Sequence, residues 1–352
     1  MKLSMVFAGG GPIAVQRELA VAAEQAGLYR LWTTESLGSD GLLRAMAIGL
    51  ATSRIRIGTG IAYTFPRLPL HAAAAAAEVA DALGGRFTFG LGAGTKGIRR
   101  RYGIEEDHPA PRFAEYVRLV RGALDSDGGY EFEGRFYRAK APSLHFHVSE
   151  AVRRGVEIYG SGVNRIILET TAQHCDGVAL HPLAGIRPYF DNVTLPALQT
   201  GSERGQRTTK LPTALWYITS VHDDPDLARQ RAATILAFYF STPSYATPLQ
   251  GTRWEDTGAK LREAFRAAGY PTPWDDLARL IPEAMTEEIC LTGTAKDVAR
   301  KINALDQQLT GMGIDELVLE PTAHGGVPEF TESCQGIIAA AAAANDGMGG
   351  PA

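Results

Sequence analysis

Long apolar runs, paired cysteines and an excess of charge are scarce in this 352-residue sequence, and each shortage excludes a class of protein. No stretch approaches the roughly 18 apolar residues that cross a bilayer, so we expect no membrane segment. Cys175, Cys290 and Cys334 are an odd number without a CxxC pair, which argues against a disulfide framework or a structural zinc site. A formal net charge of -4 provides no field that attracts nucleic acid. We therefore expect neither a membrane nor a nucleic acid as a partner.

The composition is that of a soluble globular protein with a sizeable core. Hydrophobic residues make up 45% of the chain and charged residues 21%. The start, MKLSMVFAGGG, has too short an apolar stretch for a signal peptide and is typical of a buried strand that ends in a glycine turn. These features predict a cytoplasmic location.

Short apolar runs alternate with longer segments of helical periodicity along most of the chain. Parallel strands need long crossover connections, so the alternation predicts parallel strands joined by helices. We expect eight strands, at 3–7, 30–34, 55–60, 87–92, 155–159, 177–181, 215–221 and 316–320. Eight repeats favour a (β/α)8 TIM barrel over a doubly wound open sheet, which usually has about five to seven strands. The predicted fold is an α/β barrel in a single domain over residues 1–345, with a closing helix at 334–344.

Two segments interrupt the repeat. YEFEGRFY, at 130–137, alternates aromatic and charged residues around a Glu-Gly turn and predicts a hairpin insertion near 128–150. The segment near 241–288 is rich in proline and aromatic residues, which favours a lid or substrate-pocket insertion, or else a packing or dimer element. Residues 346–352 are expected to form a disordered tail.

Glycine is frequent where the predicted strands end, and the active site of a barrel lies at those ends. Strand three ends in GTGIA (58–62), strand four in GLGAG (90–94) and strand five in YGSG (159–162). Glycine permits close backbone approach, so this rim suits a large flat ligand with an anionic tail held by backbone N–H groups. Tight turns alone would also account for some of these glycines.

Residues 92–97, GAGTKG, also match the GxGxxG pattern of dinucleotide-binding folds. That motif normally opens the helix of the first βα turn and is followed about 20 residues later by an acidic residue at the end of a second strand. Here it follows the fourth strand, and the later position falls within a helical segment at 112–124. We interpret the match as accidental.

Few ionisable side chains stand at the strand ends. Glu35 ends the second strand and is a candidate general acid or base, with a helix-capping or ion-pair role as the alternative. His181 ends the sixth strand and is a candidate for the substrate pocket or for a structural hydrogen bond. His145 and His147 alternate in an extended stretch without a third ligand nearby, so no metal site is predicted.

Several segments together resemble the luciferase-like monooxygenase superfamily. The resemblance covers at least residues 1–200. Within the superfamily, the sequence is most similar to F420-dependent oxidoreductases, including methylene-tetrahydromethanopterin reductase-like proteins. The segments are LWTTE, IRIGTGIAYTFPRLPLHAAAAAAEVADALGGRFTFGLGAG, RRRYG, HPAPRFAEYVRLVRGAL, FEGRFYR, GSGVNRIILETTAQHCDGVALHP, LTGTAKDVARKINAL and GIDELVLEP.

The resemblance implies a cofactor, coenzyme F420 rather than FMN, lying across the C-terminal ends of the strands. Its ring would be backed by a bulge of strand three, at Gly60, Ile61 and Ala62, with a non-prolyl cis peptide between the first two. Its phosphate would be held where strand five turns into a helix. The remaining implied contacts are Gly92, Gly94, Thr95 and Lys96 beside the ring or tail, and Gly160, Ser161, Gly162, Val163 and Asn164 around the phosphate.

Many relatives carry Asp-His at the end of strand two, where this sequence has Glu35-Ser36. Glu35 therefore inherits the position of the proton donor or acceptor beside the ring. Tyr63, Phe65 and His181 would line the substrate pocket with the 241–288 insertion. The basic run Arg99–Arg101 would suit an oligoglutamate tail, although a solvated helix face explains it equally well.

These features predict an F420-dependent oxidoreductase that transfers a hydride between deazaflavin C5 and a small organic substrate. One alternative is an FMN-dependent monooxygenase, which would use O2 and need a flavin reductase as partner. Another is a non-catalytic flavin-binding barrel. An alanine-rich helix at 72–77 and analogy with relatives predict a homodimer.

Overall fold

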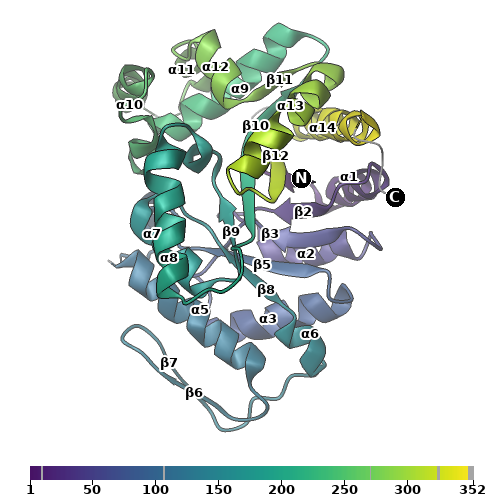
Figure 1. Cartoon of the computed structure of the whole chain (residues 1–352), viewed down its shortest axis with the longest axis vertical. Coiled ribbons are helices and arrows are strands. Elements are labelled where there is room, and N and C mark those ends of the chain that lie inside the picture. The colour runs from purple at the N-terminus through teal and green to yellow at the C-terminus, as the bar shows by residue number, and fades with distance from the viewer. Residues whose placement is uncertain (9–10, 106–107, 270, 323–325, 348–352) are drawn as a thin grey trace. The chain divides into compact units, whose positions relative to one another are not determined.

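The computed structural model describes residues 1–352 except 9–10, 106–107, 270, 323–325 and 348–352. The chain forms two compact units, whose elements are labelled in Figure 1. The central unit comprises Arg30–Ala179 and Leu195–Thr213. The terminal unit comprises Met1–Tyr29, Leu180–Thr194 and Ala214–Ala352.

Eight principal strands separated by helical segments form the framework, as the alternation of apolar runs predicted. They are β1 (Lys2–Phe7), β2 (Arg30–Thr33), β3 (Arg56–Thr59), β5 (Phe87–Gly92), β8 (Glu157–Gly160), β9 (Gly177–Leu180), β10 (Thr213–Val221) and β12 (Glu316–Pro321). Each is followed by at least one helix before the next principal strand. This order is that of the (β/α)8 barrel class, which confirms the predicted fold.

In the central unit the strands lie side by side in the order β2, β3, β5, β8 and β9, and every pairing is parallel. Helix α3 begins at Pro69, where a missing N–H costs no helical hydrogen bond. Most of its alanines are buried, so α3 packs closely. The helices of this unit are α2 (Gly41–Gly49), α3 (Pro69–Ala82), α4 (Lys96–Arg101), α5 (Pro109–Asp125), α6 (Glu150–Arg154), α7 (Arg165–His174) and α8 (Leu195–Arg204).

The predicted hairpin insertion is present as an antiparallel pair, β6 (Tyr130–Glu133) and β7 (Arg138–Ala141). Its turn is held by Glu115 of α5, whose carboxylate accepts hydrogen bonds from the backbone N–H groups of residues 135, 136 and 137, at 2.9, 2.8 and 3.2 Å. One buried carboxylate thus satisfies three turn donors and ties the hairpin to the helix.

In the terminal unit, β10 pairs with β12 on one side and with the short strand β11 (Leu291–Gly293) on the other, and β12 also pairs with β1. Helix α13 begins with a capping box between Thr294 and Asp297. The other elements outside the insertion are α1 (Ile13–Gln25), η1 (Pro182–Gly185), η2 (Phe190–Thr194), α9 (Pro225–Ser241), α13 (Ala295–Gly311) and α14 (Val327–Gly347).

The predicted insertion near 241–288 is helical and packs against α9. Buried side chains such as Leu249, Leu261, Leu277 and Met285 share a hydrophobic cluster with Phe240 of that helix. Most apolar residues of the insertion are therefore used in packing within the terminal unit. Its elements are η3 (Pro243–Tyr245), η4 (Thr247–Leu249), α10 (Glu255–Ala268), α11 (Trp274–Ala278) and α12 (Glu283–Ile289).

Some element boundaries differ from the expectation. The last helix begins at Val327 instead of 334, and it reaches Gly347, beyond the expected start of the tail at 346. The rest of that tail, 348–352, lies outside the described residues. Within the described part of the chain, every helix is too short or too polar to cross a membrane.

Candidate active site

Glu35 follows β2 in the central unit and lies in a buried ion pair with Arg67. The Glu35 side chain is 4% exposed, and Nη1 of Arg67 is 2.7 Å from both of its carboxylate oxygens. The backbone N–H of Gly41 donates to Oε2 at 3.4 Å. The ion-pair alternative raised for Glu35 from the sequence is therefore present, and it holds the carboxylate in one orientation.

Arg67 connects Glu35 to two further groups. Its Nη2 donates to Asp40, and its Nη1 also donates to the carbonyl of Tyr63 at 3.2 Å. Asp40 in turn accepts hydrogen bonds from the backbone N–H groups of Leu42 and Leu43, at 2.9 and 3.0 Å, and so caps α2. The guanidinium thus joins the end of β2, the start of α2 and the segment after β3.

Burial and charge act in opposite directions on these carboxyl groups. Burial raises the pKa of Glu35 above its ordinary value, although the hydrogen bond and charge of Arg67 pull it down. The pKa of Asp40 is lowered, because its bonds from Leu43 and Arg67 outweigh the effect of burial. Burial, with the nearby charge of Glu35, raises the pKa of Tyr63 to about 12. Glu35 is therefore the carboxyl group of this cluster that is better suited to exchange a proton.

The bulge after β3 has the form that the resemblance implied. The peptide bond between Gly60 and Ile61 is cis. The Gly60 N–H donates to the Thr33 carbonyl at 2.6 Å, and the Thr59 hydroxyl donates to the Gly90 carbonyl at 2.7 Å. Immediately after the bulge, β4 (Ala62–Tyr63) pairs with the end of β5. The bulge is thereby bonded to both neighbouring strands.

Two glycines of β5 leave room for this bulge. A Cβ atom at Gly90 would lie 1.7 Å from the Thr59 carbonyl oxygen, and one at Gly92 would lie 2.1 Å from Cδ1 of Ile61. Any larger residue would displace the bulge or its side chain. Packing thus accounts for these glycines, while Ile61 itself stays partly exposed.

The turn from β5 into α4 contains the other predicted strand-four residues. Gly94 has a φ of 66°, which favours glycine, and the hydroxyl of Thr95 caps α4 by accepting from the N–H of Ile98 at 3.3 Å. Arg99 donates to the carbonyl of Gly94 at 2.7 Å, so the first arginine of the basic run has an intramolecular partner. Lys96 is exposed, as are the other two arginines of the run.

The predicted phosphate segment lies between β8 and α7. The Ser161 N–H donates to the Leu91 carbonyl at 3.1 Å. This N–H therefore extends the sheet and is already used in a hydrogen bond within the protein. Cβ atoms at Gly160 and Gly162 would meet Thr171 and Ile167, at 2.6 and 2.4 Å, so both glycines allow close packing of α7. The segment closes with Val163, which is 6% exposed, and Asn164, the N-cap residue of α7.

The predicted substrate-pocket residues divide between the two units. Tyr63 and Phe65 belong to the central unit, where the Phe65 ring lies 4.8 Å from the guanidinium of Arg112 and 6.0 Å from that of Arg99. His181 belongs to the terminal unit and follows β9. The structure therefore gathers Glu35, the bulge and the turns after β5 and β8 in the central unit. His181, in the terminal unit, lies against the rings of Tyr239 and Tyr245.

Arg67, Asp40, Tyr239 and Glu320 are candidate residues that sequence reasoning missed. Arg67 is the single cation in the segment TFPRLPL (64–70), which follows the bulge. A lone arginine at this place could have been recognised as a candidate partner for Glu35. Glu320 precedes the last residue of β12 and accepts the hydroxyl hydrogen of Tyr239 at 2.5 Å, so its position near a strand end was also a signal. Tyr239 lies inside a helix and gave no signal of its own.

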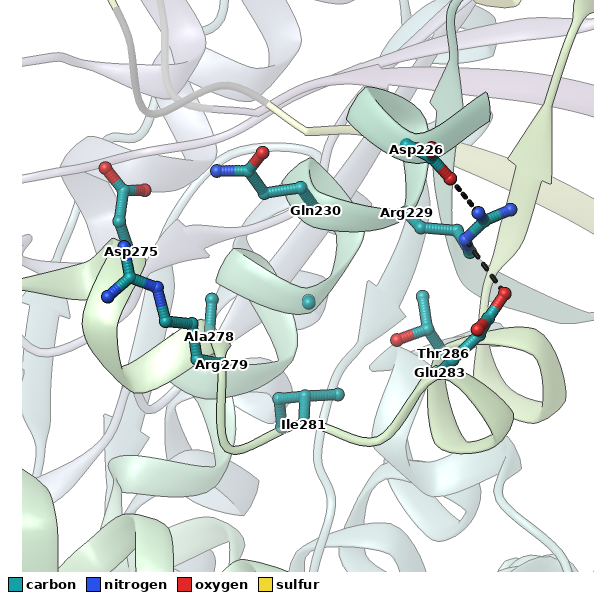
Figure 2. A pocket seen from close by; sticks show the side chains of 10 residues that line it. Asp226, Arg229, Gln230, Asp275, Ala278, Arg279, Ile281, Glu283 and Thr286 are labelled. Carbon is teal, nitrogen blue, oxygen red and sulfur yellow. Dashed lines mark hydrogen bonds and ion pairs between the residues drawn. The ribbon is translucent and has the colours of Figure 1, made fainter. Parts of the chain in front are cut away.

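A pocket of about 510 Å³ lies among α9, α11 and α12 of the terminal unit (Figure 2). Figure 2 shows Arg229 between Asp226 and Glu283, with which it forms ion pairs. None of the site residues predicted from the sequence lines it. Among the described residues, no group of three or more His, Cys, Asp or Glu side chains is arranged to hold a metal ion.

Comparison with known proteins gives consistent matches over most of the chain. The family model of luciferase-like monooxygenases matches residues 3–311. An uncharacterized protein of Mycobacterium tuberculosis is 28% identical over 82% of this chain and 85% of its own length. A 5,10-methylenetetrahydromethanopterin reductase of Archaeoglobus fulgidus is 25% identical over 81% of this chain and 84% of its own length.

The fold is also that of a solved structure, the coenzyme F420 dependent tetrahydromethanopterin reductase of Methanopyrus kandleri. The TM-score is 0.76 at 20% identity, over 96% of this chain and 98% of that one. The family match covers far more than half of the residues and includes β2, the bulge after β3 and the turns after β5 and β8. The chain belongs to the luciferase-like monooxygenase family.

Proposed function

We propose that this protein is an F420-dependent oxidoreductase that transfers a hydride between deazaflavin C5 and a small organic substrate. The observation that carries the proposal is the similarity, over more than four-fifths of the chain, to a relative named 5,10-methylenetetrahydromethanopterin reductase. In the reducing direction a carbonyl carbon gains the hydride and its oxygen gains a proton, which gives an alcohol; the oxidising direction is the reverse.

The residues of the central unit fit a flat cofactor with an anionic tail. Ile61 is partly exposed above Gly92, so the bulge offers an apolar wall against which a ring can lie. Bound F420 would supply the two-electron chemistry, and the protein would supply binding and orientation. The residues proposed to hold it are Gly60, Ile61, Ala62, Gly92, Gly94, Thr95 and Lys96 for the ring and its surroundings, and Gly160, Ser161, Gly162, Val163 and Asn164 for the tail.

Glu35 is proposed to hold the proton that accompanies the hydride. Burial favours the neutral carboxyl group and Arg67 favours the carboxylate, so neither form is strongly excluded. Arg67 is proposed as a positioning residue, because it fixes the carboxylate without being a proton donor at neutral pH. Tyr63 and Phe65 are proposed to line the substrate pocket.

The test is Glu35→Gln, which keeps the shape of the side chain and removes its titration. Cofactor binding is expected to stay within about threefold of wild type, while F420-linked turnover of a ketone and alcohol panel falls by roughly 10²–10⁴-fold. Unchanged turnover would remove Glu35 from the proton step. Binding without turnover in the wild type would favour the non-catalytic barrel.

An FMN-dependent monooxygenase is the second candidate, favoured by the description of the matching family as monooxygenases. Reduced FMN would then react with O2 and require a separate reductase as partner. Oxygen consumption that depends on added flavin reductase and FMN, in the absence of F420, distinguishes this candidate from the first.

We also propose a homodimer, on analogy with relatives alone. The alanines at 72–77, which suggested an interface, are largely buried within the chain, where α3 packs against α5. Analytical ultracentrifugation at micromolar concentration tests the proposal, and a monomer would contradict it.

A further inference from the structure

The pocket among α9, α11 and α12 is formed where the insertion packs on α9, and all of its lining residues belong to the terminal unit. Its volume of about 510 Å³ is sufficient for a small organic molecule. Ala233, Ala278 and Ile281 line it and are 8%, 5% and 7% exposed, so they give it an apolar floor. The charged side chains of the lining are more exposed than this floor.

One end of the pocket carries an ion-pair cluster with an excess of negative charge. Arg229 pairs with both Asp226 and Glu283, the second at 3.1 Å. The three side chains lie together at one side of the pocket in Figure 2. Because two carboxylates share one guanidinium, the cluster keeps a negative charge that no cation of the lining balances.

The opposite end of the pocket carries a second unbalanced carboxylate. Asp275, in the first turn of α11, lies across the pocket from the Arg229 cluster in Figure 2. Arg279 also lines the pocket, but its ion pair at 3.1 Å is with Asp276, which does not. Asp275 makes no ion pair with any residue that the structure describes. Negative charge is therefore left over at both ends, with the apolar floor between them.

A buried hydroxyl group opens into the same pocket. Thr286 of α12 lines it and is 1% exposed, and its oxygen points toward Ile281 and the interior in Figure 2. Within the described part of the chain, this hydroxyl has no hydrogen-bond partner. A buried polar group without a partner costs free energy, so a ligand that bonds to it gains by removing that cost.

We infer that this pocket binds a linear aliphatic diamine. One ammonium group faces Asp275, the other faces the carboxylates around Arg229 and donates to the hydroxyl of Thr286, and the methylene chain lies on the apolar floor. Aliphatic amines are protonated at neutral pH, so both ends of such a ligand carry a positive charge. The inference goes beyond the proposed function, because it uses none of the residues proposed for the cofactor or the substrate.

The arrangement of the charges distinguishes a diamine from other small ligands. A dicarboxylate would meet an unbalanced carboxylate at each end. A monoamine would satisfy one end and leave the other unpaired. In a diamine the second ammonium binds at a high effective concentration once the first is in place, provided that the chain spans the floor. Affinity should therefore depend on the length of the chain.

The first test is calorimetric titration of the full-length protein with butylamine, adipate and the linear diamines from diaminopropane to diaminohexane. We expect one chain length to bind most tightly, at least about fivefold more tightly than butylamine, and adipate to bind more weakly than either. The methyl NMR signal of Ile281, on the floor of the pocket, should shift with the bound diamine and so locate it.

Variants of the two ends test the role of each charge. Asp275→Asn and Glu283→Gln should each weaken binding of the preferred diamine by about three- to fivefold. Together they should reduce its affinity to that of butylamine. Glu287→Gln is the matched control, since it removes the same charge from α12 outside the lining. It should change the affinity by less than about twofold.

The hydroxyl is tested by Thr286→Val, which keeps the shape of the side chain. We expect diamine binding to weaken by about threefold, with no loss of thermal stability in the free protein, because the hydroxyl has no partner there to lose. Thr286→Ser, which keeps the hydroxyl, should bind within about twofold of wild type. A less stable Thr286→Val protein would overturn the assignment of this hydroxyl to the ligand.

Four results would overturn the inference as a whole. They are equal affinities for the diamines and butylamine, tighter binding of adipate, wild-type affinity in both charge variants, and an Ile281 signal that no diamine shifts. None of these measurements involves F420, so they fail or succeed independently of the proposed function.

Discussion

At the scale of single residues, Glu35 and Arg67 form a buried ion pair in which each charge compensates the other. Their side chains are 4% and 15% exposed, so each has lost most of its water. The guanidinium satisfies both oxygens of Glu35 and also bonds Asp40 and the carbonyl of Tyr63. Removing one partner of such a pair leaves an uncompensated charge, which is more costly than never having had the pair.

The first prediction concerns Arg67→Met. We expect it to lower the free energy of unfolding by about 3–5 kcal/mol, because the carboxylate of Glu35 stays buried without its partner. Urea denaturation at pH 7 measures the change. The matched control is Arg67→Met combined with Glu35→Gln, which should recover more than half of the loss. A loss below about 1 kcal/mol in the single variant would show that the pair is not desolvated as described.

Glu320 gives a second prediction, on pH. Burial raises its pKa from 4.5 to about 7, despite the bond from Tyr239. As the pH rises from 4.5 to 7, the unfolded chain releases this proton while the folded chain retains it, so stability falls. Glu320→Gln removes the effect and should gain about 3 kcal/mol relative to wild type between pH 4.5 and 8.

Thermal or urea unfolding of both proteins across this pH range checks the prediction. Glu35→Gln serves as a comparison: Arg67 partly offsets burial there, so the difference from wild type should change less with pH than it does for Glu320→Gln. A difference between Glu320→Gln and wild type that does not change with pH would mean that Glu320 is ionised in the folded protein at acidic pH.

At the scale of elements, the bulge after β3 depends on glycine in the adjacent strand. Gly90 lies in the middle of β5, where a Cβ atom would lie 1.7 Å from the carbonyl oxygen of Thr59. A backbone atom cannot rotate away as the end of a side chain can. The shape of residues 59–62 and the composition of β5 are therefore coupled.

The third prediction is that Gly90→Ala destabilises the protein by about 3 kcal/mol, or prevents it from folding, because the bulge must move. Gly97→Ala is the control, since its Cβ would meet only Oγ1 of Thr95 at 3.8 Å. In helix α4 the control should change stability by less than about 1 kcal/mol, in the favourable direction. Equal stabilities of the two variants, by calorimetry, would contradict the coupling.

At the scale of the whole molecule, the alternation of strands and helices could be predicted because each kind of element has its own spacing of apolar residues in the sequence. The eight principal strands are long enough for an apolar run to be visible. β4 has two residues and β11 three, which is too short for any period. The start of the last helix, at Val327, was missed because its first turns lack a regular apolar face.

The candidate site was predictable only where a residue type and a strand end coincide, as at Glu35 and His181. Arg67 meets Glu35 across 32 residues of sequence, and Tyr239 meets Glu320 across 81, so both contacts depend on the folded chain. The cis bond at Gly60-Ile61 followed from the family resemblance, since no composition or periodicity signals it. Packing explains several of the glycines that had suggested a ligand.

The central claim is that the cofactor is F420, and the most direct test is a pair of binding titrations. The purified protein is titrated with F420 and with FMN under the same conditions, each followed by quenching of the cofactor's fluorescence. We predict tight binding of F420 and binding of FMN that is at least about tenfold weaker. Tighter binding of FMN would contradict the claim and assign the protein to the oxygen-using monooxygenases of its family.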